Sequence, residues 1–179
     1  MQYKNPQIIA EIGCNHKGDL NIAKKMIKSA AKCGVRYVKF QKRNNKYLLG
    51  EKFNLPHPVE ENSYGKTYGL HREFLEFNFK EHYELYKSCR KNKISYSTSL
   101  WEKKSAEGFL RTKIKCDFLK IPSACNLDFE LLEILANKFK GKIHIIQPIE
   151  KGKIEKPSEN KFPENASLRS LNPTMTIKL

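Results

Sequence analysis

Short apolar segments alternate with longer amphipathic segments along residues 1–147. The short segments are β-branched and bounded by Gly, Pro or polar residues, which is typical of buried strands. The longer ones repeat apolar positions at helical spacing, as Ile22, Met26, Ile27 and Ala30 do. Strands are expected at residues 8–13, 35–41, 94–100, 118–123 and 142–146, and helices at residues 21–33, 80–92, 103–111 and 127–140.

This alternation predicts an α/β fold with a parallel sheet, because two parallel strands need a long crossover connection. Five strand–helix units are too few to close an eight-stranded barrel, which takes about 200–250 residues. We therefore expect an incomplete TIM-barrel-like sheet in residues 1–147. Residues 148–179 are polar, aperiodic and interrupted by Pro157, Pro163 and Pro173, so they are expected to form a disordered or divergent tail.

The longest interruption of the pattern is residues 42–69. This stretch contains several Pro and Gly residues and has no clear periodicity, so a long loop is expected there. Loops of such length are usually functional or disordered. Residues 68–77 (YGLHREFLEF) end it with a bulky basic cluster, which is a candidate lid or substrate-facing segment.

Charge and composition argue against several classes of protein. The 179 residues include 34 Lys and Arg against 19 Asp and Glu, a formal net charge of +15. The densest basic runs are only two residues long, so we expect scattered basic residues that attract small anions rather than a nucleic-acid site.

No signal core or apolar stretch of about 20 residues is present, which predicts a soluble cytoplasmic protein without a membrane partner. Five cysteines without CxxC spacing support neither a disulfide framework nor a zinc ribbon.

Polar side chains stand near the predicted carboxyl ends of four strands, where parallel α/β folds carry their active groups. They are Glu11, Asn15 and His16 on the first strand, Lys39 and Gln41 on the second, Ser97, Thr98 and Ser99 on the third, and Lys120 and Ser123 on the fourth. Lys39 and Gln41 are two residues apart and therefore share one face of their strand.

The two lysines inside predicted strands are the strongest indication of a binding site. An ammonium group inside a strand costs several kcal/mol unless an anion compensates it. Lys39 and Lys120 therefore indicate a bound anion, with the hydroxyls of Thr98 and Ser123 completing a phosphate or carboxylate site. Two alternatives remain open: the lysines pair internally with Glu11, or their ammonium groups extend to the rim of the sheet.

Other candidates are weaker when taken alone. His16 could contact a ligand or be a loop histidine that hydrogen-bonds the backbone. No HxxE, HExxH or DxD spacing indicates a local metal site. Asn126, directly before a helical pattern, is expected to be the N-cap of that helix.

Taken together, these residues lie in stretches that resemble the N-acetylneuraminate (sialic acid) synthase family. The similar stretches are IAEIGCNHKG at residues 9–18, VKFQ at 38–41, YGLHREFLEF at 68–77, YST at 96–98 and LKIPS at 119–123. Each is short, but together they follow the family's order across residues 6–144.

The resemblance implies a TIM-barrel enzyme that condenses phosphoenolpyruvate with N-acetylmannosamine, or a related N-acyl hexosamine, to a nonulosonic acid and phosphate. It also implies a divalent metal cofactor, manganese or magnesium. On this analogy Glu11 and Gln41 face the sugar and metal region. The other implied substrate contacts are Lys39, Thr98, Lys120 and Ser123 to phosphoenolpyruvate, with Asn15, His16, Tyr68 and Arg72 as further candidates.

The resemblance ends after His144. The family's fifth strand runs into a Ser-Thr-Gly-Met-like segment, which residues 145–148 replace with Ile-Ile-Gln-Pro. The strands that supply two metal-binding histidines and the C-terminal antifreeze-like domain have no counterpart, as a truncation or frameshift would produce. We therefore expect a half-site without metal ligands that is weakly active or inactive alone. The alternative is a noncatalytic anion-binding or protein-interaction fragment, and exposed sheet edges could give a homo-oligomer.

Overall fold

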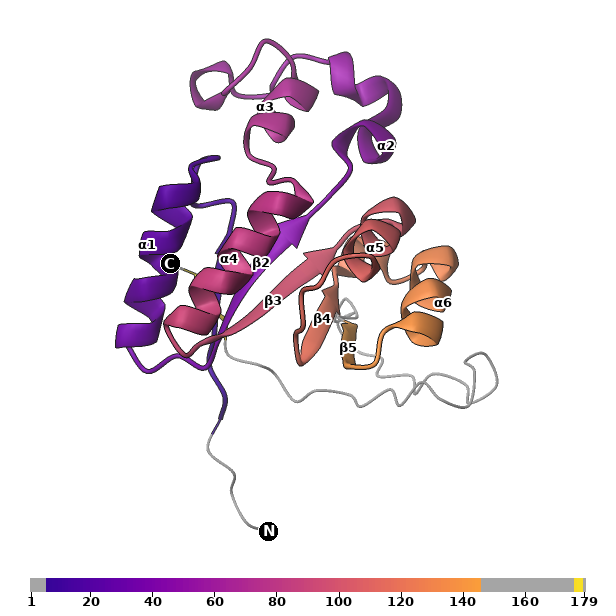
Figure 1. Ribbon diagram of the computed structural model, residues 1–179. Coiled ribbons are helices and arrows are strands. Elements are labelled where there is room, and N and C mark those ends of the chain that lie inside the picture. Colours follow the sequence, from indigo (N-terminus) through magenta and orange to yellow (C-terminus); the bar gives the residue numbers. More distant parts are fainter. Residues whose placement is uncertain (1–5, 146–175, 179) are drawn as a thin grey trace, which may run out of the picture.

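The computed structural model describes residues 6–145 and 176–178 of the 179-residue chain. Its centre is one parallel sheet with the strand order β5-β4-β3-β2-β1-β6 (Figure 1). The strands are β1 (Ile9–Gly13), β2 (Tyr37–Lys42), β3 (Ser95–Leu100), β4 (Phe118–Ile121), β5 (Lys142–Ile145) and β6 (Thr176–Lys178). The predicted α/β class with five parallel strands is confirmed.

The sixth strand was not predicted. β6 is three residues long and pairs with β1 at the sheet edge opposite β5. It falls in the segment 148–179, where aperiodic sequence predicted only a tail. The rest of that predicted tail lies outside the described residues.

Four longer helices accompany the strands. They are α1 (Leu20–Lys32), α4 (Phe79–Lys91), α5 (Lys103–Leu110) and α6 (Phe129–Lys138). α1 packs against α4, and α5 packs against α6 (Figure 1). Each of the four begins at a side-chain cap. In α1, Asp19 accepts from the backbone N–H groups of Asn21 and Ile22, and in α4, Asn78 forms a capping box with Glu81.

The start of α6 corrects one prediction. Its N-cap is Asp128, whose Oδ1 accepts a hydrogen bond from the Leu131 backbone N–H at 3.1 Å. The expectation that Asn126 caps this helix is therefore wrong. Asn126 still belongs to the 3-10 turn at Ser123–Cys125, because its N–H bonds back to the Ser123 carbonyl at 3.4 Å.

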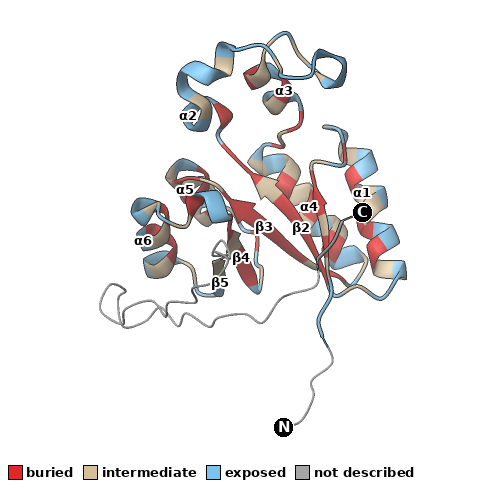
Figure 2. Ribbon diagram, turned by 180° about the vertical axis from the view of Figure 1, so that it is seen from behind, coloured by how far each residue is buried: buried red, intermediate tan, exposed pale blue. Residues whose placement is uncertain are grey.

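The hydrophobic core lies between these helices and one face of the sheet. Val38 and Phe40 of β2 are fully buried and belong to the same cluster as Ile27 of α1, Leu85 of α4 and Leu135 of α6. Figure 2 shows the buried strands at the centre of the fold. Burying a side chain of this size contributes about 1.5–3 kcal/mol. Because side chains alternate along a strand, the residues between these core positions project to the opposite face.

The segment between β2 and α4, residues 43–78, is not the loop that was predicted. It contains α2 (Asn45–Leu49), α3 (Tyr68–Phe74) and two 3-10 turns, Gly50–Asn54 and Glu60–Asn62. Both helices begin at a side-chain cap: the side chain of Asn44 accepts from the Tyr47 N–H, and that of Thr67 accepts from the Leu70 N–H. Such caps are hard to recognise in short polar sequences without a hydrophobic repeat. This β2–α4 segment stands beyond the arrowhead of β2 and is largely exposed (Figures 1 and 2).

The β1–α1 loop contacts the β2–α4 segment closely at one glycine. Gly18 has a positive φ of +73°, and a Cβ added to it would lie 2.2 Å from the backbone carbonyl oxygen of Phe74 at the end of α3. Only a residue without a side chain fits against that carbonyl. The contact therefore fixes how α3 sits against the loop.

Two further expectations concern the cysteines and membrane-spanning helices. All five cysteines carry free thiols, which agrees with the expected absence of a disulfide framework. Within residues 6–145 and 176–178, no helix combines the length and apolar character that crossing a bilayer requires.

Candidate functional site

The face of the sheet opposite the helices carries a row of polar side chains, and we call it the inner face. Strand register places Glu11 of β1 beside Lys39 of β2, and Lys39 beside Ser97 of β3. One step toward the carboxyl ends, register joins Gln41, Ser99, Lys120 and His144 across β2 to β5. Lys39 and Gln41 share this face, as their spacing predicts.

Lys39 is paired inside the protein. Its ammonium group donates hydrogen bonds to Glu11 Oε2 and, at 3.2 Å, to Ser99 Oγ, and the residue is only 4% exposed. Burial lowers the pKa of Lys39 to about 8; the charges of Lys120 and Arg43 lower it further, whereas Glu11 raises it. Internal pairing with Glu11, one of the alternatives that the sequence left open, therefore describes Lys39.

Lys120 is in a different situation. It is half-buried, lies in register with Ser99, and is near enough to Lys39 for its charge to depress the pKa of that lysine. Among the residues that the structure describes, no carboxylate lies within 4.0 Å of the Lys120 ammonium group. The two lysines therefore converge across β3, and Lys120 is the one free to bind an external anion.

Arg43 is a site residue that the sequence analysis missed. Its Nη2 donates to Gln41 Oε1, its Nη1 lies 3.6 Å from Cys14 Sγ, and its guanidinium carbon lies 4.2 Å from the centre of the Trp101 ring. Burial lowers the pKa of Arg43, and the nearby charge of Arg72 lowers it further. The sequence did hold a signal, because Arg43 continues the two-residue spacing of Lys39 and Gln41.

Glu11 carries a second unpaired polar group of the site. Its Oε1 is buried and has no hydrogen-bond partner among the described residues. Gly13, at a φ of +55°, leaves room beside it: a Cβ there would lie 3.9 Å from Glu11 Oε1 and 3.4 Å from Gln41 Nε2. One carboxylate oxygen of Glu11 is therefore an unsatisfied hydrogen-bond acceptor among the described residues.

The described residues do not fit the divalent metal that the resemblance implies. Glu11 supplies one open carboxylate oxygen, and no group of three or more His, Cys, Asp or Glu side chains in residues 6–145 could hold a metal ion. A manganese or magnesium site normally needs several oxygen ligands. No step of the chemistry proposed below is therefore assigned to a metal.

Thr98 lies on the opposite face of the sheet from Lys39 and Lys120. Register pairs it with Phe40, whose side chain lies on the helix-covered face, and Thr98 is fully buried there. Its hydroxyl is 3.4 Å from the Ser99 carbonyl oxygen. Ser99 takes the position on the inner face that the sequence analysis gave to Thr98, because the alternation along β3 puts residues 97 and 99 on that face.

His16 is also turned away from the inner face. It is 2% exposed, its ring stacks on Phe77 at 4.1 Å, and its Nδ1 accepts a hydrogen bond from the Gly18 N–H at 3.1 Å. Burial lowers the pKa of His16 to about 4, so the ring is neutral at physiological pH. This geometry matches the loop-histidine alternative.

The remaining candidates surround the site at greater distance. Ser123 and Asn15 are exposed, the first just beyond β4 and the second at the tip of the β1–α1 loop. Arg72 is half-buried in α3 and close enough to Arg43 to affect its pKa. Tyr68, also in α3, has its ring 5.7 Å from that of His57, within the β2–α4 segment. The charge of Arg72 thereby links α3 to Arg43 at the end of β2.

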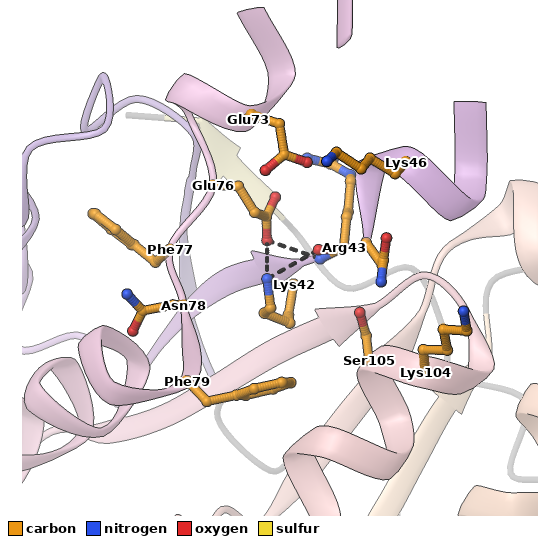
Figure 3. A pocket seen from close by; sticks show the side chains of 11 residues that line it. Lys42, Arg43, Lys46, Glu73, Glu76, Phe77, Asn78, Phe79, Lys104 and Ser105 are labelled. Atoms are coloured by element: carbon orange, nitrogen blue, oxygen red, sulfur yellow. Dashed lines mark hydrogen bonds and ion pairs between the residues drawn. The ribbon is translucent and has the colours of Figure 1, made fainter. Parts of the chain in front are cut away.

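A cavity of about 440 Å³ opens beside the carboxyl end of β2 (Figure 3). A buried ion pair lies in its wall: Lys42 Nζ is 2.9 Å from Glu76 Oε1, which also accepts the Arg43 N–H at 2.8 Å. The lining residues are Lys42, Arg43, Asn44, Lys46, Glu73, Glu76, Phe77, Asn78, Phe79, Lys104 and Ser105. The sequence analysis did not predict this cavity, because its lining comes from four parts of the chain: β2, the β2–α4 segment, the start of α4 and α5.

Acidification is expected to destabilise the fold through two buried histidines. Burial lowers the pKa of His16 to about 4 and that of His82 to about 3, whereas an unfolded histidine titrates near 6.5. Between pH 6.5 and about 4 the unfolded chain therefore binds more protons, so the free energy of unfolding falls as the pH falls. Urea unfolding between about pH 7 and pH 4.5 measures this decline.

A variant separates this effect from other titrations. Burial raises the pKa of Glu76, which acts in the opposite sense because the folded chain then holds a proton that the unfolded chain has lost. His82→Gln keeps a polar group near the Tyr96 hydroxyl, which lies 2.7 Å from His82 Nδ1, but removes the titration. Its stability should decline less steeply below pH 6.5 than that of the wild type; equal slopes would contradict the assignment.

Comparisons with known proteins identify the family of this chain. The sequence profile of the NeuB family matches residues 26–147. The chain is 37% identical over 131 residues to the N-acetylneuraminate-9-phosphate synthase of Homo sapiens, covering 73% of this chain and 36% of that protein. It is 33% identical over 121 residues to the N,N'-diacetyllegionaminic acid synthase of Campylobacter jejuni, covering 67% and 36% respectively.

A solved structure supports the same relationship. The fold is similar to the N-acetylneuraminic acid (sialic acid) synthetase of Leptospira borgpetersenii in complex with citrate, with a TM-score of 0.64 and 26% identity over 83% of this chain and 47% of that one. The chain spans about a third of the length of the curated relatives it matches. The profile match covers more than half of the 179 residues, and the chain therefore belongs to the NeuB family.

Proposed function

We propose that this chain carries the phosphoenolpyruvate-binding part of an active site that condenses phosphoenolpyruvate with an N-acyl hexosamine. The products would be a nonulosonic acid and phosphate. The names of the relatives, an N-acetylneuraminate-9-phosphate synthase and an N,N'-diacetyllegionaminic acid synthase, support a product of this class. They differ in the sugar, so an N-acetylmannosamine derivative and a related N-acyl hexosamine both remain within the proposal.

One observation carries the proposal: Lys120 has no carboxylate partner among the described residues although it lies beside the buried Lys39 and in register with Ser99. Two ammonium groups that repel each other are stabilised when an anion binds between them. A phosphate or carboxylate can accept charge-assisted hydrogen bonds from both, and the Ser99 hydroxyl adds a further polar contact. Phosphoenolpyruvate offers both anionic groups.

The neighbouring residues suit the sugar. Glu11 Oε1 is free to accept a hydrogen bond from a hydroxyl or acylamino group, and Gln41, held by Arg43, supplies an amide donor. The enol carbon of phosphoenolpyruvate would attack the sugar aldehyde carbon, forming the new carbon–carbon bond. The aldehyde carbonyl π bond would break and leave an alkoxide, while the former enol carbon that bears the phosphate would become cationic. Water would then add to that cationic carbon and give a proton to the alkoxide, and phosphate would leave with cleavage of its carbon–oxygen bond, which forms the ketone. Lys120 and Lys39 would stabilise negative charge on the phosphate.

A second candidate function is anion binding without turnover. It is favoured by the coverage, because the chain matches only 36% of each of the two curated relatives, and by the absence of a three-ligand metal site in the described part of the chain. Binding and catalysis can therefore be tested separately.

The decisive variant is Lys120→Ala. It should weaken phosphoenolpyruvate binding by roughly 10- to 100-fold, the effect of losing a hydrogen bond to a charged group, as measured by isothermal titration calorimetry. The matched control is Lys115→Ala, which removes an exposed lysine preceding β4 and should leave the affinity unchanged. Equal affinity of the wild type and Lys120→Ala would contradict the proposed site.

Turnover is tested with the wild-type chain. Phosphoenolpyruvate and N-acetylmannosamine are incubated with a manganese salt, and nonulosonic acid and phosphate are measured. Product formation supports the enzyme. Phosphoenolpyruvate binding that depends on Lys120 without product formation supports the noncatalytic anion-binding fragment instead.

A further inference from the structure

We propose that the edge of the sheet where the strands start binds the phosphate backbone of a double-stranded nucleic acid. The proposed phosphoenolpyruvate site lies toward the opposite edge, at the carboxyl ends of the strands, so this inference goes beyond the proposed function and does not depend on it. Three features support it: the position of the helix-to-strand connections, their unpaired positive charge, and their lack of large exposed apolar side chains.

Four helix-to-strand connections lie along this edge. Parallel strands all start at the same edge, so each helix has to return the chain to it. The connections lead from α1 to β2, from α4 to β3, from α5 to β4 and from α6 to β5, and these four strands are neighbours in the sheet (Figure 1). We call the connections, with the ends of the adjoining elements, the basic edge: residues 32–36, 90–95, 111–117 and 138–142.

Hydrogen bonds hold the connections in place relative to one another. The Ser95 N–H donates to the Arg36 carbonyl oxygen at 2.9 Å, and the Lys142 N–H donates to the Asp117 carbonyl oxygen at 2.9 Å. The Tyr37 hydroxyl at the start of β2 also donates to Asp117 Oδ2 at 3.1 Å. Neighbouring strands lie about 4.8 Å apart, so the four strand starts span about 14 Å along the sheet. The basic edge is therefore one surface built on a fixed frame.

The positive charge of this surface is largely unpaired. Each of the four connections carries two or three Lys or Arg residues, all exposed, whereas the basic edge has a single carboxylate, Asp117. Among the described residues, Arg111 alone of these cations forms an ion pair, with Glu107 at 3.7 Å. A cavity of about 310 Å³ is lined by Arg90, Lys93, Ile94 and Ser95. The cations are Lys32, Arg36, Arg90, Lys91, Lys93, Arg111, Lys113, Lys115, Lys138, Lys140 and Lys142.

Helix stability explains only part of this charge. A cation in the last turn interacts favourably with the helix dipole, and Lys32, Lys91 and Lys138 occupy the last turns of α1, α4 and α6. In contrast, α5 has no basic residue in its last turn, yet Lys113 and Lys115 follow it in the connection to β4. The cations beyond the helix ends therefore have no evident role in the fold, and an external polyanion would neutralise them.

The sequence did not indicate this surface, because its densest basic runs are only two residues long. Whether cations form a binding surface depends on their arrangement in space, not only on runs along the chain. The fold collects the basic edge from four segments that helices and strands separate in the sequence. The expectation of scattered basic residues therefore does not extend to this edge.

The chemistry of the basic edge favours a nucleic-acid duplex over other polyanions. None of its residues is a large exposed hydrophobic one, whereas protein interfaces usually have an apolar core and membrane-surface helices insert apolar side chains. Its one aromatic residue, Phe139, packs against the hydrophobic core, so no ring is left for the base stacking that binds single strands. The closely spaced phosphates of a duplex require only exposed cations.

The binding test is fluorescence anisotropy, in which the whole chain is titrated into labelled DNA and RNA duplexes of about 20 base pairs. At about 50 mM salt we expect a dissociation constant of roughly 1–100 μM, which rises steeply with salt as released counter-ions compete. Lys93→Ala/Lys113→Ala/Lys140→Ala removes one cation from each of three connections. It should weaken binding at least about tenfold and make the slope of log affinity against log salt shallower by about 0.9 per lysine.

Two further variants separate the surface from net charge and from unfolding. Lys52→Ala/Lys66→Ala/Lys80→Ala removes the same charge from exposed positions in the β2–α4 segment and at the start of α4, and it should change the affinity and the salt slope far less. Asp117→Asn keeps an acceptor for the Tyr37 hydroxyl but removes the carboxylate of the basic edge. It should strengthen binding by roughly two- to fivefold, which loss of folding cannot imitate.

Binding of either duplex with these variant effects supports the proposal. It is overturned if the wild type does not bind at low salt, or if the two triple variants lose equal affinity. Poly-glutamate, or vesicles of phosphatidylserine and phosphatidylcholine, that bind as tightly as the duplexes would overturn the assignment to a nucleic acid, and tighter binding of single-stranded DNA would overturn the assignment to a duplex. The proposed function fails separately, through phosphoenolpyruvate binding that does not depend on Lys120.

Discussion

Replacing Lys39 with Met is expected to lower the free energy of unfolding by about 3–5 kcal/mol. Lys39 is 4% exposed, and its partner Glu11 lies in the same inner-face row. Removing the ammonium group leaves the Glu11 carboxylate buried without its cation, with Ser99 losing a hydrogen-bond donor as well. Urea unfolding followed by circular dichroism measures the loss, which would be a large share of the total stability of a domain this size.

A double variant tests whether the unpaired charge is the cause. Glu11→Gln/Lys39→Met removes both charges while keeping a polar group at position 11, and it should recover most of the stability lost in Lys39→Met. Replacing a buried ion pair by uncharged groups of similar volume is often nearly neutral. A double variant as unstable as the single one would show that the loss comes from packing around residue 39 instead.

Gly18→Ala is expected to cost about 3 kcal/mol of unfolding free energy, combining an unfavourable positive φ with overpacking. The new Cβ would lie 2.2 Å from the Phe74 carbonyl oxygen, which belongs to the backbone at the end of α3 and cannot rotate away. Either the β1–α1 loop or α3 has to move. Chemical denaturation measures the loss, and proteolysis within the β2–α4 segment should become faster.

Gly34→Ala is the matched control for this prediction. Gly34 has nearly the same φ, +72° against +73° for Gly18, but nothing lies within 4 Å of its added Cβ. Its substitution should cost only about 1 kcal/mol, the penalty of the backbone conformation alone. If the two variants lost equal stability, the contact with Phe74 would contribute nothing.

The sequence predicted the fold well where burial is periodic. Apolar runs such as residues 35–41 and helical repeats such as residues 21–33 gave β2 and α1 within two residues, because both elements bury one continuous face. It failed for α2 and α3, which are short, largely exposed and defined by the caps Asn44 and Thr67 rather than by a hydrophobic repeat. A three-residue strand such as β6 likewise carries no periodicity to detect.

The candidate site was likewise predicted only in part. Alternation along β2 correctly placed Lys39 and Gln41 on one face, and extending it by one step would have found Arg43. On β3 both the residue pattern and the family resemblance pointed to Thr98, whereas register places Ser99 beside Lys120. The Glu11–Lys39 pair was one of the alternatives that the sequence left open. The Lys42–Glu76 pair was not predicted, because it joins residues far apart in the chain.

The alternation of apolar and polar side chains in the middle of β2 should make this strand intolerant of changes in chain length. Val38 and Phe40 meet the helices while Lys39 and Gln41 face the opposite way, and these four positions are consecutive. Deleting one residue here would exchange the two sets, turning polar side chains toward the helices and aliphatic and aromatic side chains toward the inner face. The inner-face site and the stability of the fold would then be lost together, whereas a point substitution can affect either one alone.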